Sequence, residues 1–179
     1  MRLFETSGET SRYCESLLDQ KRSIGFVPTM GALHSGHIAL VQKAKQENDQ
    51  VGVSIFVNPI QFNNPDDLKK YPRNLEKDLH LLRQVLTANY FVFCPSENEI
   101  YPIKSTKKYN FGSLEKVMEG EHRPGHFNGV GVVVDRLFRI VKPTRAYFGE
   151  KDFQQLAIIK KLTEIEQLPI TIVPCAIVR

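Results

Sequence analysis

Cysteine is scarce in this sequence, and its spacing excludes the chemistry that paired thiols support. The chain has three cysteines, Cys14, Cys94 and Cys175, which are odd in number and far apart. This pattern excludes a disulfide framework and a Cys-x-x-Cys redox pair. We therefore expect reduced, mostly buried thiols, as in a cytoplasmic protein.

Long hydrophobic runs are absent as well. No apolar stretch approaches the roughly 20 residues that a membrane-spanning helix needs. Residues 1–6 (MRLFET) lack the apolar core of a secretory signal. We therefore expect no membrane partner and a cytoplasmic location.

Patterns typical of nucleic-acid binding are also missing. The net charge is +4, with scattered basic pairs such as Lys69-Lys70 and Lys160-Lys161. No basic patch with interleaved aromatic residues and no zinc knuckle accompanies them. Such pairs usually lie on a solvated face, so we expect no nucleic acid partner, and the charge suits an anionic small molecule.

What the sequence does contain is an alternation of short apolar runs and helical patterns. At 179 residues, the chain is long enough for one sizeable domain. Continuous apolar runs predict buried parallel strands, at residues 24–27, 51–57, 90–94, 146–148 and 170–173. Helical patterns lie between them, at residues 11–21, 38–46, 75–86, 133–141 and 158–165. This order predicts an α/β fold with a doubly wound, Rossmann-like parallel sheet.

Polar residues follow the expected strands where such a sheet binds ligands. In doubly wound sheets the ligand lies outside the carboxyl ends of the strands. Segments rich in polar side chains come after four of them, at residues 29–37, 58–62, 149–155 and 174–179. Residues 95–129 are the least regular part, and we expect loops and short strands there that fold over the site.

The most informative segment is residues 28–37, PTMGALHSGH, which joins the first expected strand to a helix. A strand, a glycine turn and a helix N-terminus together predict a phosphate site, because glycine admits an oxyanion close to the backbone and the first helical N–H groups point at it. His34 and His37 add imidazole donors that can be charged near neutral pH. The pattern therefore indicates polyphosphate binding with charge stabilisation at phosphorus.

Two other interpretations of these histidines stay open. His37 shares a helical face with Leu40, Val41 and Ala44, which is typical of a hydrogen-bonded core histidine. A zinc site is the second, but no cysteine lies nearby and no third ligand has metal spacing. We expect no resident metal.

Further candidate residues follow the other strands. Asp152 is a suitable helix N-cap, and Lys151 beside it is a cation able to reach a phosphate. Gln155 matches the capping-box position three residues after Asp152, which competes with a ligand-binding role. Gln61 follows an Asn-Pro turn and has no such local role. Neutral amides suit a substrate that carries hydroxyls and a carboxylate.

Two weaker features complete the candidates. Residues 123–127 (RPGHF) form a basic, glycine-containing loop that either covers the site or is an ordinary surface loop. Asp78 lies beside a leucine stripe, and we expect it to be a solvated carboxylate. No Ser-His-Asp or Cys-His arrangement is present.

Six ordered segments give the chain its resemblance to a known family: VPTMGALHSGH, SIFVNPIQF, DLKKYPRN, EIYP, MEGEHRPGHFNGV and FGEKDFQQL. Across residues 1–179 it resembles the pantothenate synthetases (pantoate–β-alanine ligases). That family belongs to the His-x-Gly-His nucleotidyltransferase superfamily.

The resemblance implies an ATP-dependent ligase with two half-reactions. The carboxylate of pantoate attacks the α-phosphorus of ATP, giving pantoyl adenylate and pyrophosphate, and the amine of β-alanine then displaces AMP. Mg²⁺ accompanies the ATP, and the enzyme is commonly a homodimer. Another nucleotidyltransferase, which transfers AMP to a phosphate acceptor, is the alternative; it needs a cationic pocket where this chain has Gln61 and Gln155.

The resemblance also implies roles for individual residues. His37, His34 and Lys151 are expected to be catalytic, with His37 as proton donor. Pantoate is expected on Gln61, Gln155 and Asn58. The implied ATP site comprises Met30, Gly31, Ala32, Leu33, His34, Ser35, Gly36, His37, Gly149, Glu150, Lys151, Asp152 and Val178.

The resemblance further implies that residues 1–179 are the N-terminal, nucleotide- and pantoate-binding domain. Members of the family continue with a short loop that acts on the phosphates and with a small C-terminal domain that closes over ATP. Neither is part of this sequence, so we expect a truncated form with impaired activity.

Overall fold

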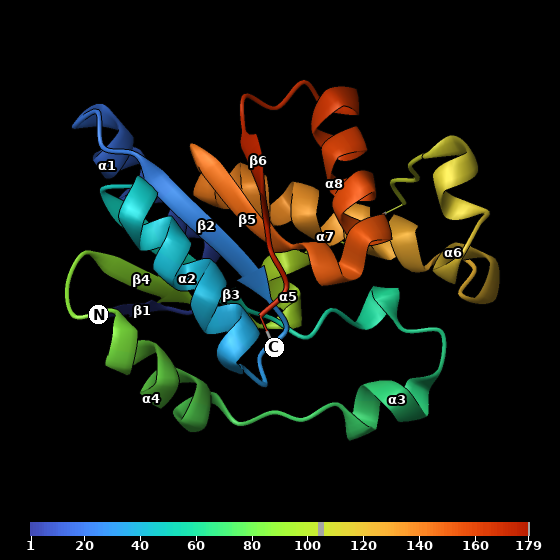
Figure 1. Cartoon of the computed structure of the whole chain (residues 1–179), viewed down its shortest axis with the longest axis horizontal. Helices are drawn as coiled ribbons and strands as arrows, with labels where there is room; N and C mark the ends of the chain where they lie inside the picture. Colours follow the sequence, from blue (N-terminus) through green and yellow to red (C-terminus); the bar gives the residue numbers. More distant parts are fainter. Residues whose placement is uncertain (104–105, 179) are drawn as a thin grey trace.

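Six parallel strands form one sheet at the centre of the molecule (Figure 1). The computed structural model describes residues 1–103 and 106–178; Arg179, the last residue of the predicted domain, lies outside them. The spatial order is β1-β4-β3-β2-β5-β6. The strands are β1 (Arg2–Phe4), β2 (Ile24–Thr29), β3 (Gln50–Ile55), β4 (Tyr90–Phe93), β5 (Arg145–Gly149) and β6 (Thr171–Cys175). The predicted doubly wound parallel sheet is therefore confirmed.

Five longer helices account for the predicted helical patterns. They are α1 (Ser7–Asp19), α2 (Ser35–Glu47), α4 (Leu75–Val85), α7 (His126–Val141) and α8 (Phe153–Ile165). Short α-helices are α3 (Pro65–Lys70), α5 (Glu97–Ile100) and α6 (Glu119–His122), and short 3₁₀ helices are η1 (Pro59–Gln61), η2 (Gly112–Glu115) and η3 (Glu150–Asp152). None of the helices within the described ranges is long and apolar enough to cross a membrane.

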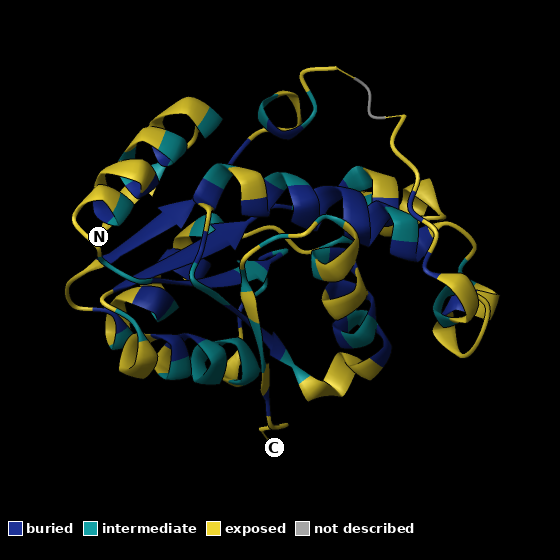
Figure 2. Ribbon diagram, turned by 90° about the horizontal axis from the view of Figure 1, so that it is seen from above, coloured by how far each residue is buried: buried dark blue, intermediate teal, exposed yellow. Residues whose placement is uncertain are grey.

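The sheet carries a separate hydrophobic cluster on each face, which explains why its strands read as continuous apolar runs. Ala146 and Phe148 of β5 pack in the cluster that includes α1, α7 and α8 residues. Tyr147, between them in sequence, packs on the other side with α2 and α4 residues. Successive strand residues point to opposite faces, so a strand covered on both sides must be apolar throughout. Figure 2 shows the central strands as a buried layer, with exposed residues on the helices outside it; the edge strands β1 and β6 are partly exposed.

The expected short strands in residues 95–129 are wrong. The described part of that segment forms α5, η2, α6 and the first residues of α7 instead. Side chains, rather than a neighbouring strand, satisfy its backbone groups. The Asn128 amide oxygen accepts from the Tyr109 N–H, and Gln154 bonds the Leu114 and Val117 carbonyls and the Glu119 N–H.

The sheet splits between β2 and β5 at their carboxyl ends. β2 pairs with β3 at six positions and β5 pairs with β6 at five, whereas β2 and β5 pair only at Gly25↔Arg145 and Phe26↔Ala146. The chain also reverses its winding direction here, because β3 lies on one side of β2 and β5 on the other. Such a switch point leaves a crevice between diverging loops, where ligands bind in open α/β sheets.

Close packing of α7 against η1 generates a test of the fold near this crevice. A Cβ added to Gly129 would lie 2.7 Å from the Ile60 carbonyl oxygen and 2.8 Å from the Gln61 Cα. Because both are backbone atoms, we expect Gly129→Ala to lower the free energy of unfolding by about 1–3 kcal/mol, measured by urea denaturation.

Gly8→Ala in α1 is the matched control. Its nearest atom is the end of the flexible Arg12 side chain, at 3.5 Å. Alanine is preferred over glycine in helices, so Gly8→Ala should leave the free energy of unfolding unchanged or raise it by up to ~1 kcal/mol. Equal effects of the two substitutions would contradict the close packing of α7 on η1.

Candidate functional site

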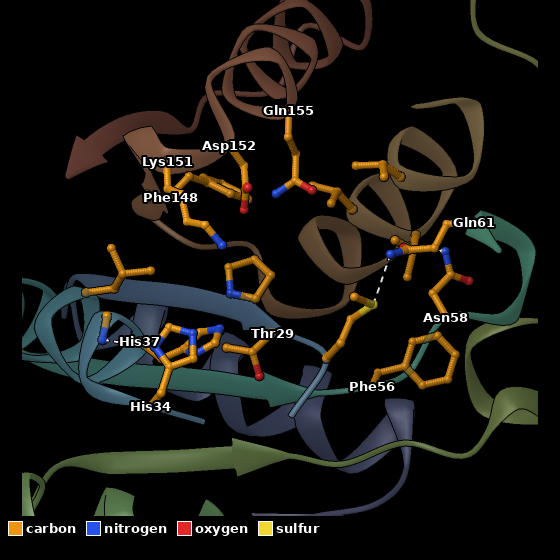
Figure 3. Close-up of a pocket in the computed structure, with 18 of the residues that line it drawn as sticks. Thr29, His34, His37, Phe56, Asn58, Gln61, Phe148, Lys151, Asp152 and Gln155 are labelled. Carbon is orange, nitrogen blue, oxygen red and sulfur yellow. Dashed lines mark hydrogen bonds between the residues drawn. The ribbon is translucent and has the colours of Figure 1, made fainter. Parts of the chain in front are cut away.

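A pocket of about 340 Å³ occupies the crevice between β2 and β5. The pocket is lined by the end of β2, the start of α2, the loop around η1, Tyr71, one face of α7, the segment from β5 to α8, and residues 176–178. A pocket of this size suits a small-molecule ligand. Figure 3 shows its residues approaching from opposite sides.

The turn between β2 and α2, residues 30–34, has two residues in the left-handed region of backbone space. Gly31 has φ +81° and Ala32 has φ +50°. The Thr29 hydroxyl accepts from the Gly31 N–H at 3.2 Å and donates to the Ser54 carbonyl oxygen at 2.7 Å. Thr29, the last residue of β2, thereby links the start of the turn to β3.

Asp78 of α4 fastens the same turn from the other side, so the expectation of a solvated carboxylate is wrong. Asp78 is only 2% exposed. Its carboxylate oxygens accept from the Ala32 N–H at 3.0 Å and from the Leu33 N–H at 2.8 Å. Two backbone donors from a distant turn satisfy the buried carboxylate, and the helical pattern around Asp78 does not reveal them.

His34 begins α2 as its N-cap. Its Nδ1 accepts a hydrogen bond from the Gly36 N–H at 3.1 Å, and its ring centroid lies 4.2 Å from that of His37. The helix therefore begins at Ser35, three residues earlier than the apolar pattern predicts. The first N–H groups of α2 and both imidazoles lie at the same side of the pocket.

His37 is not the hydrogen-bonded core histidine of the alternative interpretation. It lines the pocket, and its Nδ1 is buried with no partner among the described residues. An unpaired acceptor costs less than an unpaired N–H, so the buried Nδ1 favours the tautomer with its proton on Nε2. That tautomer leaves His37 with a ring N–H to donate.

Burial is the main cause that lowers the pKa of His37 to about 4; the charges of His34 and Lys151 act in the same direction, and that of Asp78 opposes them. In the ligand-free protein His37 is therefore neutral near pH 7, contrary to the expectation of an imidazole charged near neutrality. A bound polyanion would reverse the balance and favour the imidazolium.

Lys151, Asp152 and Gln155 lie on the opposite side of the pocket from the histidines, and the Lys151 side chain extends toward them (Figure 3). Asp152 holds the N-cap position of α8, but its side chain makes no capping hydrogen bond. Gln155 completes no capping box within the described ranges. The predicted N-cap position of Asp152 is therefore confirmed, but neither side chain makes a capping bond among the described residues, and their polar atoms are available to a ligand.

The neighbouring Gln154 has the structural role instead. It is buried, and its amide group makes the bonds that hold residues 114–119 against α8. Adjacent glutamines thus differ in function because they point to different sides of α8.

Asn58 and Gln61 come from the loop around η1. Asn58 is fully buried; its amide donates to the Gln61 Oε1 at 3.0 Å and to the Gly129 carbonyl at 3.1 Å, and it accepts from the Tyr101 hydroxyl at 2.8 Å. All side-chain polar atoms of Asn58 thus have protein partners, which makes it a support for Gln61. The Gln61 amide nitrogen lies 2.9 Å from the Met30 sulfur.

The other predicted residues divide into two groups. Met30, Gly36, Gly149 and Val178 line the pocket, together with the residues described above. Gly31, Ala32, Leu33, Ser35 and Glu150 do not line it. Leu33 is buried in the hydrophobic core, and Gly31 and Ala32 shape the turn behind the histidines. These residues can act only through their backbone or their neighbours.

The basic loop at residues 123–127 does not line this pocket. Arg123 pairs with the exposed Glu119. His126 is buried at the start of α7, and its Nδ1–H donates to the Gln61 carbonyl oxygen at 2.9 Å. The segment therefore supports η1 through the bond from His126 to Gln61, on the side of η1 away from the pocket.

An apolar wall is the part of the site that the sequence did not indicate as functional. Its members belong to α7, to β5 and to the residue that follows β3: Phe56, Val130, Val133, Val134, Leu137 and Phe148. The same 3.6-residue stripe predicts a core-facing helix, so the pattern alone could not separate core from pocket. Tyr71 also lines the pocket.

Metal-binding residues are not gathered in the part of the chain that the structure describes, where no group of three or more His, Cys, Asp and Glu side chains is arranged to hold an ion. Asp152 is the one carboxylate among the described residues that line the pocket.

Comparison with known proteins places the chain among named relatives. The family model for pantoate-beta-alanine ligase matches residues 2–179. The pantothenate synthetase of Flavobacterium psychrophilum is 51% identical over 180 residues, which covers 100% of this chain and 64% of that protein. The pantothenate synthetase of Christiangramia forsetii is 58% identical over 159 residues, which covers 88% of this chain and 56% of that protein. The chain thus spans less than two thirds of these relatives.

Solved structures give the same result. The pantoate-beta-alanine ligase from Francisella tularensis, complexed with beta-gamma ATP and beta-alanine, matches with a TM-score of 0.94 and 44% identity; the match covers 100% of this chain and 68% of that chain. Pantothenate synthetase from Thermus thermophilus matches with a TM-score of 0.90 and 43% identity, covering 100% of this chain and 63% of that one.

The pKa of His37 provides a test of the pocket geometry. We expect its imidazole to titrate with a midpoint near 4, far below the ordinary value of 6.5, when followed by NMR. The folded pKa lies below the unfolded value, so the unfolded state binds more protons between the two. The contribution of His37 to stability is complete above pH 6.5 and is lost as the pH falls toward 4.

His37→Gln should remove this titration and flatten the fall in stability over the same pH range. A tenfold difference in proton affinity between the folded and unfolded states corresponds to about 1.4 kcal/mol, so urea denaturation at several pH values can resolve the change. Burial also lowers the pKa of His126, so part of the fall should persist. A His37 midpoint at or above 6.5 would contradict the buried, unpartnered Nδ1.

Proposed function

The chain belongs to the pantoate-beta-alanine ligase family, and we propose that it condenses pantoate with β-alanine at the expense of ATP, through a pantoyl adenylate. The products are pantothenate, AMP and pyrophosphate. The observation that carries this proposal is the pocket between β2 and β5, which has a volume of about 340 Å³. Anion-binding groups and neutral amides both line it.

The proposed nucleotide side is formed by His34, His37, Lys151 and the start of α2. The positive end of the helix dipole and the first-turn N–H groups other than that of Gly36, which donates to His34, favour phosphate oxygens there. Lys151 extends toward the histidines from the opposite side, so a phosphate chain between them would contact both. Asp152 is suited to ribose hydroxyls and Val178 to the adenine face.

The proposed pantoate side is formed by two amides and the apolar wall. Gln155 has a free side-chain amide among the described residues, and Asn58 orients the amide of Gln61. Amides pair with hydroxyl and carboxylate groups without requiring a fixed charge. The valines of α7 suit the branched aliphatic part of pantoate.

The residues of this pocket can promote adenylation by stabilising charge. As the pantoate carboxylate attacks the α-phosphorus, negative charge grows on the phosphoryl and pyrophosphate oxygens. Neutral His37 would donate its Nε2–H to them, and Lys151 and the α2 N–H groups would add fixed donors. Preorganised donors of this kind lower the barrier because they need no reorganisation during the reaction. β-Alanine would then attack the acyl carbon and release AMP, with Gln61 facing both substrates.

Mg²⁺ is proposed to enter with ATP. Mg²⁺ usually keeps several water ligands and binds substrate phosphates, so it needs no dedicated cage of protein ligands. The ion would neutralise phosphate charge; the protein residues would orient the phosphates around it.

We also propose that the protein is a cytoplasmic homodimer, as family membership favours. Analytical ultracentrifugation measures the association state directly, and a mass corresponding to 20.5 kDa at all concentrations would contradict the dimer.

The proposal is tested by incubating the protein with ATP, Mg²⁺, pantoate and β-alanine and omitting each in turn. Pyrophosphate release should require pantoate and ATP but not β-alanine, and pantothenate formation should require all three. Release that requires a phosphorylated acceptor instead of pantoate would favour transfer of AMP to phosphate and contradict the proposal.

His37→Ala should lower the rate of pantoyl adenylate formation by roughly 10²–10⁴, the usual weight of a positioned acid or charge stabiliser. Thermal denaturation should show that the variant stays folded, because the buried Nδ1 of His37 has no hydrogen-bond partner among the described residues. A variant with normal turnover per folded molecule would contradict the assignment.

The two adjacent glutamines provide a matched pair. Gln155→Ala should weaken pantoate binding, measured by calorimetry, by about 1.5–3 kcal/mol and leave the melting temperature unchanged. Gln154→Ala should instead lower the free energy of unfolding by about 1–3 kcal/mol, since it leaves buried backbone groups unpaired. A loss of stability in Gln155→Ala together with a loss of pantoate binding in Gln154→Ala would contradict both assignments.

A further inference from the structure

Asp78 is a buried acid whose position the proposed reaction does not explain. It is not among the residues that line the pocket, and it makes no ion pair within the described ranges 1–103 and 106–178. Burying a carboxylate without a cation is costly unless hydrogen bonds satisfy it. The two N–H groups that do so, those of Ala32 and Leu33, both belong to the turn between β2 and α2.

That turn needs external support because its backbone is unfavourable. Ala32 has φ +50°, a region where a Cβ atom is crowded, and Gly31 before it has φ +81°. A Cβ at Gly31 would lie 3.0 Å from the nearer carboxylate oxygen of Asp78, so the backbone passes directly against the acid. Hydrogen bonds from both following N–H groups to one carboxylate fix the left-handed conformation.

The conformation of this turn decides where the histidines lie. His34 follows Leu33 directly, and its ring caps α2 through the Gly36 N–H. His37 is in the first turn of the same helix. A change at residues 31–33 would therefore rotate His34 and displace the first N–H groups of α2 from the pocket.

We propose that Asp78 is a positioning residue for the nucleotide side of the site, where its carboxylate holds the turn so that His34, His37 and the α2 N-terminus face the phosphates. This inference rests on the proposed function. Asp78 lies on α4, outside the pocket, and would act on the substrate only through the turn that it holds.

The negative charge of Asp78 also supports the proposed role of His37. It is the one charge that raises the pKa of His37, opposing burial, His34 and Lys151. An acid behind the imidazole would also stabilise His37 once its Nε2–H is shared with a phosphate.

Asp78→Asn is the direct test, because asparagine keeps the shape but offers only one acceptor oxygen and places an NH₂ against the second N–H. We expect the dissociation constant for ATP, measured by calorimetry, to rise by about ten-fold to a hundred-fold, as for a lost charge-assisted hydrogen bond. The dissociation constant for pantoate should change less than about two-fold, because Gln61 of the pantoate side contacts the turn at Met30 and not at Ala32 or Leu33, the residues that Asp78 holds. At least one of the two amide protons, those of Ala32 and Leu33, should lose its protection from hydrogen exchange, because asparagine can accept from only one of them at its remaining oxygen.

Glu76→Gln is the matched control, since it removes one carboxylate from the exposed face of the same first turn of α4. It should change neither dissociation constant nor the protection of the two amides. An equal loss of ATP binding in both variants would indicate an effect of overall charge and overturn the proposal.

The other outcomes are also decisive. A folded Asp78→Asn protein with unchanged ATP affinity, or with ATP and pantoate affinity lost together, would overturn the positioning role. If Asp78→Asn does not fold, Asp78→Glu, which keeps the charge but displaces the oxygens by one methylene, must still weaken ATP binding more than pantoate binding. Equal effects of Asp78→Glu on both ligands would overturn it.

The amide measurement separates this proposal from the proposed function. A wild-type protein that binds neither ATP nor pantoate would contradict the function. Protection of the Ala32 and Leu33 amides that survives Asp78→Asn would contradict the role of Asp78, whatever the ligand.

Discussion

The site depends on the early end of pairing between β2 and β5. Hydrogen bonds join these strands at two register positions near their amino ends, and beyond them the strands separate. The chain can leave β2 through a turn and enter α2 on one side of the gap, and leave β5 through η3 and enter α8 on the other. Two helix N-termini, two histidines and a lysine are therefore brought to one opening by strand pairing rather than by local sequence.

The two sides of the opening are supported in different ways. The turn before α2 is held by Thr29 and Asp78 from the body of the sheet and from α4. The loop around η1 is held by Asn58, His126 and the close approach of α7. In both cases a residue that does not line the pocket, Asp78 or His126, helps to fix the residues that do. A site that stabilises charge without reorganising needs such support.

The sequence predicted the sheet, five of its strands and the five longer helices, because continuous apolar strands and amphipathic helices are local patterns. The pocket lies at the carboxyl ends of the strands, where the fold class predicts a ligand. β1 is too short, at three residues, to form such a pattern. The roles of Asp78 and Gln154 could not be predicted, because their hydrogen-bond partners are distant in sequence. The partners of Asp78 lie 45 and 46 residues away, and those of Gln154 lie 35 to 40 residues away. The apolar wall on α7 was hidden for a different reason, since a stripe that faces a pocket has the same period as one that faces the core.

In the proposed reaction the carboxylate of pantoate attacks the α-phosphorus of ATP and is thereby activated. The most direct measurement uses pantoate with heavy oxygen in its carboxylate, followed by mass spectrometry of the products formed with ATP and β-alanine. Because the carboxylate oxygen stays on the α-phosphorus, we expect AMP that carries one heavy oxygen atom and pyrophosphate that carries none. ADP with labelled inorganic phosphate, or unlabelled AMP formed together with pantothenate, would contradict it.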